Sequence, residues 1–242
     1  MKFKFIASVF LTVAIAGCSA VPLRTSPKER SPSSELDVSC IGTASAEVFV
    51  IYLHGMDSVQ PSPQEIVNRN ILNQIAKTKN IRFALPRAQL KCPNQPESIC
   101  WGWKFDQAEL AAVLPQILQS RSTCFSQDKP FIILGFSNGG YLLAHWYSQA
   151  MMPSYSQRPI SLVASGSGKG DIPSNITNLS QNPSLTLIIG KQDQFNFDPT
   201  QSLFHRLKDL KAPANLIEFD GGHVLDENSL LKALESAPQT LK

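Results

Sequence analysis

Three residue types that could together perform nucleophilic chemistry follow one another along the chain. Ser137 stands between glycines in Gly135-Phe136-Ser137-Asn138-Gly139, where a short apolar run meets a pattern with helical spacing. Asp193 and His223 each come a few residues after a later apolar run. A serine hydroxyl needs a neighbouring base to become a good nucleophile, and the base needs an acid to orient it. This order predicts a Ser-His-Asp catalytic triad, although Gly, Ser and Asn also make ordinary strand-to-helix turns.

The spacing of the glycines around Ser137 has a steric explanation. A nucleophilic serine must stand on a tight turn so that its Oγ projects from the edge of a sheet. Glycines two residues before and two residues after it remove side chains that would collide with the neighbouring strand and helix. The helix that follows directs its free N–H groups toward developing negative charge.

Other carboxylates compete with Asp193 for the role of the acid. Asp198 directly precedes Pro199, which is typical of a helix N-cap followed by proline at the first helical position. Asp220 is too near His223 in sequence to approach it from another strand. Asp193 therefore remains the preferred acid.

Other histidines compete with His223 for the role of the base. His145 falls within the helical pattern after Ser137, beside Trp146, where a packed side chain is the simpler interpretation. His205 falls on a predicted surface helix. The Gly-Gly turn around His223, just past a strand-like run, fits the base better.

An acyl-transfer site also needs two N–H donors for the oxyanion. The backbone of Asn138, directly after the nucleophile, is expected to supply one. The loop after the first apolar run reads Leu53-His54-Gly55-Met56, and the backbone N–H of Met56 is expected to supply the other. His54 is then expected to anchor this loop, although an ordinary turn histidine is the alternative.

The elements that must position these residues alternate along the chain. Short, almost continuously apolar runs predict strands covered on both faces, at residues 48–53, 81–85, 131–135, 160–165, 185–190 and 215–219. Longer amphipathic stretches between them predict helices, at about 64–78, 106–120, 138–151, 199–211 and 226–236. Such alternation predicts an α/β fold with a mostly parallel sheet of about six or more strands and helices on both faces.

The motifs at the ends of these strands resemble those of a known group of enzymes. "YLHGM", "GFSNGG", "GKQDQF" and "GGH" are similar to motifs of small α/β-hydrolase serine esterases of the carboxylesterase/phospholipase and acyl-protein thioesterase family. The resemblance covers roughly residues 47–236 and implies an α/β-hydrolase fold without a separate cap domain. Asp57 and Ser58 stand where that family usually carries a second glycine and an acid, so the substrate class is left open.

Four cysteines follow the first 18 residues, and in an oxidising compartment an even number favours two disulfides with three possible pairings. In the strand order of the hydrolases, the strands near Cys40 and Cys124 are neighbours, and this implies a disulfide between those two residues. Cys92 and Cys100 share one loop and would form the second disulfide. Neither a Cys-x-x-Cys pair nor clustered histidines occur, so no metal is expected. The resemblance to the hydrolases implies a reaction that needs no cofactor.

The N-terminus predicts export to the bacterial cell envelope. Lys2 and Lys4 precede an apolar segment too short to span a membrane comfortably, and Ile15-Ala16-Gly17-Cys18 resembles a bacterial lipobox. We therefore expect a signal peptide at 1–17, lipidation at Cys18, a Ser/Pro-rich tether to residue 45 and a hydrolase domain at 46–242. Ser19 favours the outer membrane over the inner one, while a plain secretory signal or a lone anchor helix is the alternative. Without residues 1–17 the chain has 20 basic and 19 acidic residues, which offers no basic surface for nucleic acid.

The long loop 86–105 follows a strand at the edge where ligand sites of α/β sheets are built. Trp101, Trp103 and Phe105 at its end are expected either to wall a substrate pocket beside Ser137 or to pack onto the domain surface.

The sequence thus predicts a serine hydrolase that cleaves a small-molecule or lipid ester or thioester through an acyl-enzyme. A peptidase or amidase on the same fold, or a non-catalytic binding lipoprotein, is the alternative. The oligomeric state is not predicted.

Overall fold

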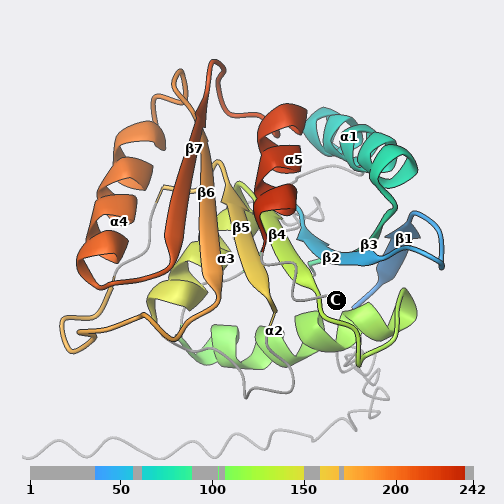
Figure 1. Cartoon of the computed structure of the whole chain (residues 1–242), viewed down its shortest axis with the longest axis horizontal. Coiled ribbons are helices and arrows are strands. Elements are labelled where there is room, and N and C mark those ends of the chain that lie inside the picture. Colours follow the sequence, from blue (N-terminus) through green and yellow to red (C-terminus); the bar gives the residue numbers. More distant parts are fainter. Residues whose placement is uncertain are drawn as a thin grey trace, which may run out of the picture. The chain divides into compact units, whose positions relative to one another are not determined.

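The computed structural model describes residues 36–56, 62–88, 103, 107–149, 159–168 and 172–237. Its centre is a seven-stranded sheet in the order β1-β3-β2-β4-β5-β6-β7, in which only β1 runs antiparallel to its neighbour (Figure 1). The strands are β1 (Val38–Ile41), β2 (Val48–Leu53), β3 (Ile81–Pro86), β4 (Ile132–Phe136), β5 (Ser161–Ser165), β6 (Ser184–Gly190) and β7 (Ala214–Phe219). The predicted mostly parallel sheet is confirmed, and all six expected strands are present.

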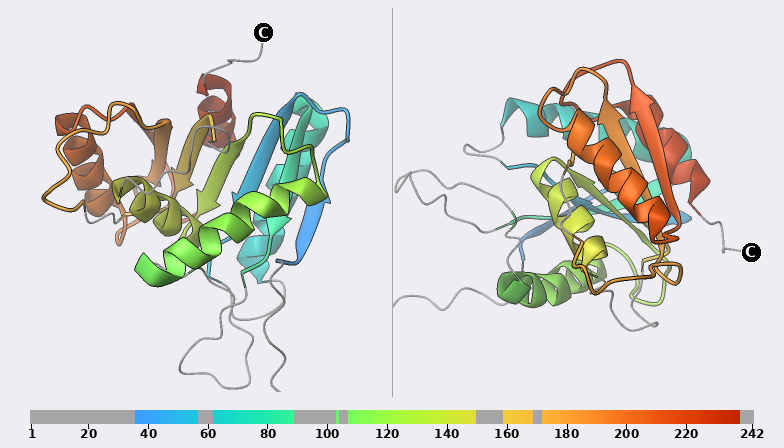
Figure 2. Two further views of the ribbon diagram at one scale, coloured as in Figure 1. Left: turned by 90° about the horizontal axis from the view of Figure 1, so that it is seen from below. Right: turned by 90° about the vertical axis from the view of Figure 1, so that its left-hand side faces the viewer.

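Helices cover both faces of the sheet (Figures 1 and 2). They are α1 (Pro63–Lys79), α2 (Gln107–Ser120), α3 (Asn138–Ser148), α4 (Phe197–Asp209) and α5 (Glu227–Ser236), with a short 3₁₀ turn η1 (Arg121–Thr123) after α2. Buried side chains of α1 and α5 form one core, and those of α2, α3 and α4 form the other. Each strand contributes to both cores because successive side chains point to opposite faces.

Strand β2 illustrates this division. Ile51 and Leu53 belong to the core beneath α2, α3 and α4, whereas Val50 and Tyr52 belong to the core beneath α1 and α5. A strand that is buried on both faces has no polar face to reveal its period, which is why it reads as a continuous apolar run. Among the described residues, no separate cap domain stands apart from this sheet, and no helix has the length and apolarity needed to cross a membrane.

The start of α4 corrects one detail of the sequence analysis. The predicted N-cap, Asp198, lies inside the first turn, because the helix begins at Phe197 and its N-cap residue is Asn196. The Asn196 side chain makes no capping bond. Asp198 still favours the helix electrostatically, because a negative charge in the first turn faces the positive end of the helix dipole.

Strand β1 is a second correction, because residues 38–41 fall within the stretch assigned to the tether. They pair antiparallel with β3, with Val38 opposite Pro86 and Ile41 opposite Phe83. A four-residue strand beside a Ser/Pro-rich stretch has too short a pattern to be recognised from sequence. The ordered domain therefore begins before residue 46.

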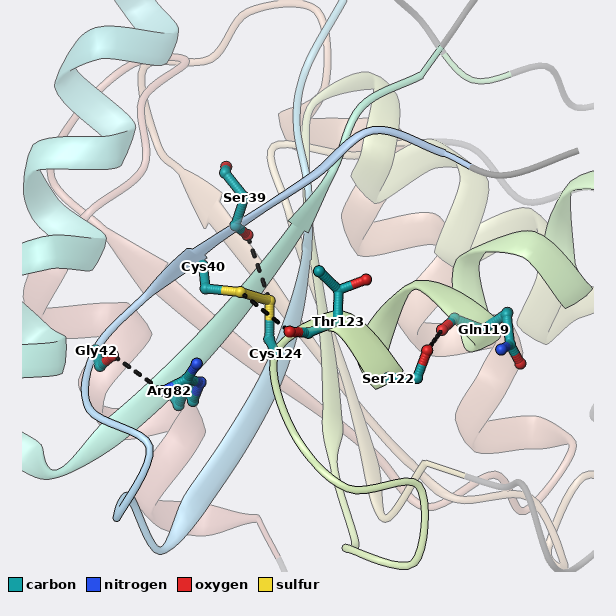
Figure 3. Close-up of a disulfide and its surroundings, with 8 residues drawn as sticks. All are labelled: Ser39, Cys40, Gly42, Arg82, Gln119, Ser122, Thr123 and Cys124. Carbon is teal, nitrogen blue, oxygen red and sulfur yellow. Dashed lines mark hydrogen bonds between the residues drawn. A yellow bond between two sulfur atoms is a disulfide. The ribbon is translucent and has the colours of Figure 1, made fainter. Parts of the chain in front are cut away.

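A disulfide joins Cys40 of β1 to Cys124, just after η1 (Figure 3). This is the pairing implied by the hydrolase resemblance, although Cys40 lies within the edge strand and not in a connection ahead of the sheet. Its partner segment leads into β4, so the bond ties the edge strand to a segment 84 residues away. Cys92 and Cys100 lie outside the described residues.

We expect loss of this disulfide to destabilise the domain, because the cross-link restricts a long loop in the unfolded chain. Replacing both partners (Cys40→Ser with Cys124→Ser) should lower the free energy of unfolding by about 2–5 kcal/mol in urea titrations. Each protein should be measured with and without reductant, so that any effect of the other cysteines appears as a residual in the double variant. A double variant as stable as the oxidised wild type would contradict this expectation.

Candidate active site

Ser137 occupies a strained turn between β4 and α3. It is the N-cap residue of α3, with φ 49° and ψ −114°, a conformation that residues with a side chain rarely adopt. The surrounding backbone holds the turn in place. The Ser137 N–H donates to the carbonyl of Ser165 over 2.8 Å, and the Gly139 N–H donates to the carbonyl of His54 over 3.1 Å.

The two flanking glycines let α3 approach β4 and β2 closely. A Cβ atom at Gly135 would lie 2.3 Å from the carbonyl oxygen of Gly139, and a Cβ at Gly139 would lie 2.2 Å from that of Leu53. Both contacts are with backbone, which cannot move aside without displacing helix α3 or strand β2. The glycine spacing seen in the sequence therefore follows from contacts on either side of the serine.

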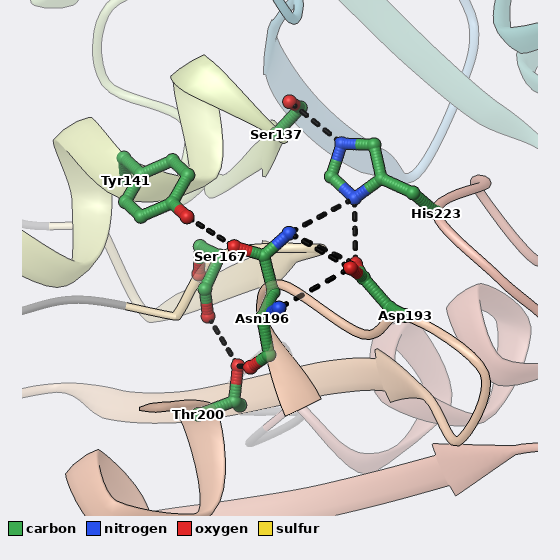
Figure 4. Close-up of polar contacts among 7 residues, drawn as sticks. All are labelled: Ser137, Tyr141, Ser167, Asp193, Asn196, Thr200 and His223. Atoms are coloured by element: carbon green, nitrogen blue, oxygen red, sulfur yellow. Dashed lines mark hydrogen bonds and ion pairs between the residues drawn. The ribbon is translucent and has the colours of Figure 1, made fainter. Parts of the chain in front are cut away.

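The three residues singled out by the sequence meet at the carboxyl ends of the strands (Figure 4). Nε2 of His223 lies 2.8 Å from Oγ of Ser137, and Nδ1 of His223 lies 2.6 Å from Oδ2 of Asp193. Ser137 follows β4, Asp193 follows β6 and His223 follows β7. With Nδ1–H donating to the carboxylate, Nε2 of the neutral imidazole is left to accept the serine proton.

His223 is partly exposed and is held in place by its surroundings. Its ring packs at a centroid distance of 5.3 Å from the ring of Phe136. On another side the ring approaches Gly166, where an added Cβ would lie 3.0 Å from Cε1 of the imidazole. Gly166 also has a positive φ of 62°. In this packed position Nε2 faces Ser137 and Nδ1 faces Asp193.

The carboxylate of Asp193 is bound mainly by Asn196, which the sequence analysis did not identify. Nδ2 of Asn196 lies 3.0 Å from both Oδ1 and Oδ2 of Asp193, and the Asn196 backbone N–H donates to Oδ1 over 3.2 Å. The same Nδ2 lies 3.3 Å from Nδ1 of His223. Because Nδ1 carries the proton that it gives to Asp193, this last approach brings two donors together and adds no bond.

Asn196 is in turn held by two neighbours (Figure 4). The hydroxyl of Tyr141 on α3 donates to Oδ1 of Asn196, which fixes which end of the amide faces Asp193. Oγ1 of Thr200 lies 2.6 Å from the carbonyl of Asn196 and 2.7 Å from that of Ser167, just beyond β5. Asn196 makes no capping bond to α4 because its amide is engaged by Asp193 and Tyr141.

These bonds decide the ionisation of Asp193. Its burial alone would raise the pKa of the carboxyl group, but hydrogen bonds from the Asn196 side chain and from His223 outweigh burial. The pKa of Asp193 is therefore lowered from its ordinary value. The carboxylate stays ionised at neutral pH, which is the state that orients and stabilises a charged histidine.

The loop after β2 lies directly against the nucleophile. A Cβ at Gly55 would lie 3.2 Å from Cβ of Ser137, and Met56 beside it lines the cavity at Ser137. The buried ring of His54 anchors the loop, since Nε2 accepts the Ala88 N–H over 3.1 Å and Nδ1 lies 2.6 Å from the Gly55 carbonyl. In the described part of the chain, the backbone N–H groups of Met56 and Asn138 have no hydrogen-bond partner.

Of the two roles expected for Trp103, the structure favours packing against the domain. Trp103 is only 2% exposed, belongs to the core and does not line the cavity beside Ser137. Its indole N–H donates to the carbonyl of His54 over 3.0 Å, and a buried indole needs such a partner. Trp101 and Phe105 lie outside the described residues.

The side chain of Asn138 has a structural function of its own. Its Oδ1 accepts the backbone N–H of Trp103, and its Nδ2 donates to the Trp103 carbonyl over 3.4 Å. Asn138 thus fixes the position of Trp103, and Trp103 in turn supports the loop that contains His54. A short amide is suited to this task because it donates and accepts at once.

A cavity of about 260 Å³ opens beside Ser137. Its lining includes Ser137 and His223 of the triad and residues from the first two turns of α1. A larger hollow of about 670 Å³ lies at the opposite edge of the sheet, lined by residues such as Glu47, Asp128 and Leu234. It contains none of the triad residues, so the smaller cavity is the candidate substrate site.

Comparisons with known proteins agree with this geometry. Residues 46–231 match the family model described as serine hydrolase (FSH1). A comparison with curated protein sequences found no match. Because the family model covers most of the chain, this protein belongs to the serine hydrolase (FSH1) family.

Solved structures of similar fold include three esterases. Esterase PE8 is 18% identical, with a TM-score of 0.60 over 83% of this chain and 97% of that one. Acyl-protein thioesterase 2 of Zea mays is 16% identical, with a TM-score of 0.60 over 83% and 96% of the two chains. The Bacillus cereus carboxylesterase is 14% identical, with a TM-score of 0.59 over 84% and 93%. These similarities show the α/β-hydrolase fold expected from the sequence.

Replacing Asn196 by alanine should destabilise the protein by about 1.5–3 kcal/mol at pH 7, because the buried carboxylate of Asp193 loses its amide donor. A carboxyl group with a lowered pKa contributes stability above its unfolded pKa of about 3.9, and the contribution is lost as pH falls through the folded pKa. The difference between wild type and Asn196→Ala in urea titrations should therefore shrink below about pH 4. The exposed Asn228, replaced by alanine, is the matched control. An Asn196→Ala penalty that is the same at pH 3 and pH 7 would contradict this assignment.

Proposed function

We propose that this member of the serine hydrolase family is an esterase that cleaves a carboxylic ester or thioester through an acyl-enzyme, with Ser137, His223 and Asp193 as its triad. The observation that carries the proposal is the unbroken hydrogen-bond chain from Ser137 Oγ through the imidazole to a buried carboxylate. The fold neighbours described as an esterase, a thioesterase and a carboxylesterase support the substrate class.

In the first half of the reaction, Oγ of Ser137 attacks the acyl carbonyl carbon and its proton passes to Nε2 of His223. The new Oγ–C bond forms as the carbonyl electron pair moves onto oxygen. The N–H groups of Asn138 and Met56 stabilise that oxyanion, and the first belongs to the free donors at the start of α3. The bond to the leaving alcohol or thiol then breaks, and the leaving group takes its proton from Nε2.

In the second half, a water molecule attacks the acyl-serine while Nε2 of His223 accepts its proton. The second oxyanion collapses, the acyl–Oγ bond breaks, and the proton returns to Ser137 as the free acid departs. Asp193 remains ionised throughout and stabilises the imidazolium in each half. Asn196 and Tyr141 touch no reacting atom and act as positioning residues for this carboxylate.

Labelling with a fluorophosphonate probe tests the proposed nucleophile, because such probes phosphonylate only an activated serine. The wild type should label, and Ser137→Ala should lose labelling completely. His223→Ala should label at least a hundredfold more slowly, since the serine loses its base. Ser122→Ala removes an exposed serine on η1 and should label as the wild type does. A wild type that does not label, or a Ser137→Ala variant that labels equally, would rule out the proposed nucleophile.

We also propose that Cys18, outside the described residues, carries a lipid that holds the enzyme at the bacterial cell envelope, with the outer membrane favoured. The support from the fold is the point at which the chain enters the sheet. Val38 pairs with Pro86 at the carboxyl end of β3, which is the edge that carries Ser137. A tether ending there would join the domain on its catalytic side.

Exposed apolar side chains on that edge agree with a nearby membrane or lipid substrate. The large hydrophobic residues exposed among those described all follow or begin elements at the catalytic edge: Met56, Ile66, Val67, Phe195 and Val224. Phe195, between Asp193 and Asn196, is 87% exposed. Exposed apolar residues at one edge of a domain agree with a surface that meets lipid or another apolar partner.

Metabolic labelling with radioactive palmitate in a Gram-negative host tests the anchor. The wild type should be labelled and sediment with membranes, whereas Cys18→Ala should lose both properties. Ser137→Ala should remain labelled, which separates lipidation at Cys18 from an acyl group held by the nucleophile. A labelled, membrane-bound Cys18→Ala variant would disprove the proposed anchor.

A further inference from the structure

One wall of the cavity beside Ser137 is polar and firmly held. It consists of Gln64, Glu65 and Asn68 from the first two turns of α1. Glu65 is 6% exposed and Asn68 is 1% exposed, although both are among the residues that normally prefer water. A buried carboxylate in a cavity that also contains the nucleophile is in a position to bind part of the substrate.

The wall is anchored to the sheet by Tyr52 of β2. The hydroxyl of Tyr52 donates to Oε2 of Glu65 over 3.0 Å and accepts from Nδ2 of Asn68 over 3.0 Å. Burial first, and then the negative charge of Glu65, raise the pKa of Tyr52 well above its ordinary value. Tyr52 therefore keeps its proton, and the direction of both hydrogen bonds is fixed.

Two further bonds complete the wall. Nε of Arg69 donates to Oε1 of Glu65 over 2.8 Å from the partly exposed side of the helix. Nε2 of Gln64 donates to Oδ1 of Asn68 over 2.9 Å. The first bond occupies an acceptor of the wall, and the second occupies one donor and one acceptor of the wall.

Most of the hydrogen-bonding positions that the wall leaves unused are acceptor positions. An ionised carboxylate offers about four acceptor positions, and Glu65 uses one on each oxygen. Oδ1 of Asn68 keeps a second lone pair, and Oε1 of Gln64 has no partner in the described part of the chain. The wall therefore favours a ligand that donates hydrogen bonds.

We propose that the wall formed by Gln64, Glu65 and Asn68 binds hydroxyl groups of the substrate, so that the enzyme selects esters of a polyol or of a hydroxy acid. This inference rests on the proposed esterase function and names the substrate class of that site. A plain alkyl group in the same place would displace water from Glu65 without replacing its hydrogen bonds, which costs free energy. A carboxylate there would be repelled by Glu65.

The size of the cavity agrees with a small hydroxylated group. Its volume of about 260 Å³ corresponds to roughly eight or nine water-sized atoms at about 30 Å³ each. A glycerol unit or a four-carbon hydroxyacyl group fits within this space. A hydroxyl is favoured over an ammonium group because Arg69 already balances the charge of Glu65.

The experiment compares esters that differ only in hydroxyl groups and measures kcat/KM for the full chain. One pair sets glyceryl monobutyrate against propyl butyrate, which differ on the alcohol side. The other pair sets ethyl 3-hydroxybutyrate against its 3-methoxy ether, which differ on the acyl side. At least one hydroxylated ester should be favoured by about tenfold to a hundredfold, as expected for a hydrogen bond to a charged group. The pair that shows the preference identifies which side of the ester enters the cavity.

Glu65→Gln should reduce that preference to a few-fold, because the amide keeps the shape but loses the charge and one acceptor. Glu47→Gln, an exposed residue at the opposite edge of the sheet, should leave it unchanged. If Glu65→Gln does not fold, the wild-type ratios of kcat/KM between paired esters are sufficient to test the hydroxyl site. Ratios within twofold in a wild type that labels with fluorophosphonate would overturn the hydroxyl site and leave the esterase intact. A wild type that neither labels nor cleaves any of these esters would overturn both.

Discussion

The close approach of α3 to β4 and β2 is the constraint on which the rest of the site depends. Two glycines let backbone meet backbone where any side chain would collide, and the residue between them is forced to a φ of 49°. That conformation costs free energy of order 1–3 kcal/mol, and the sheet and helix on either side hold it in place. In return, the serine stands at the sheet edge with a free N–H group beside it. The strands of a parallel sheet then bring the acid and the base to the same edge.

A second consequence concerns how the acid is held. Asn196 has the residue type and the position of a helix cap, yet its amide serves the carboxylate of Asp193 and is oriented by Tyr141. The start of α4 therefore gives up a capping bond so that a buried charge can be satisfied. Because Tyr141 lies on the helix that begins at the nucleophile, the same helix contributes to holding both the serine and the acid. The site is thus a connected unit rather than three independent side chains.

The sequence was sufficient to predict the features that depend on short-range patterns and on the order of residues along the chain. The six parallel strands, the five helices and the positions of Ser137, Asp193 and His223 all follow from apolar runs and the residues that end them. Asn196 was missed because an asparagine in a polar turn has many interpretations, and because Asp198-Pro199 nearby matches a stronger capping pattern. Strand β1 was missed because four residues give too short a pattern. The role of Trp103 was left open because sequence does not show whether a loop aromatic faces a cavity or the core, which here depends on a hydrogen bond to the carbonyl of His54.

The central claim is that a covalent acyl-serine forms at Ser137 and depends on the held imidazole. The most direct measurement is intact mass after mixing the enzyme with p-nitrophenyl butyrate and quenching with acid within milliseconds to seconds. The account predicts a species heavier by one butyryl group, mapped to the peptide that contains Ser137, which disappears as the substrate is consumed. Hydrolysis that proceeds with no acyl adduct at any time, or with the adduct on a different residue, would contradict it.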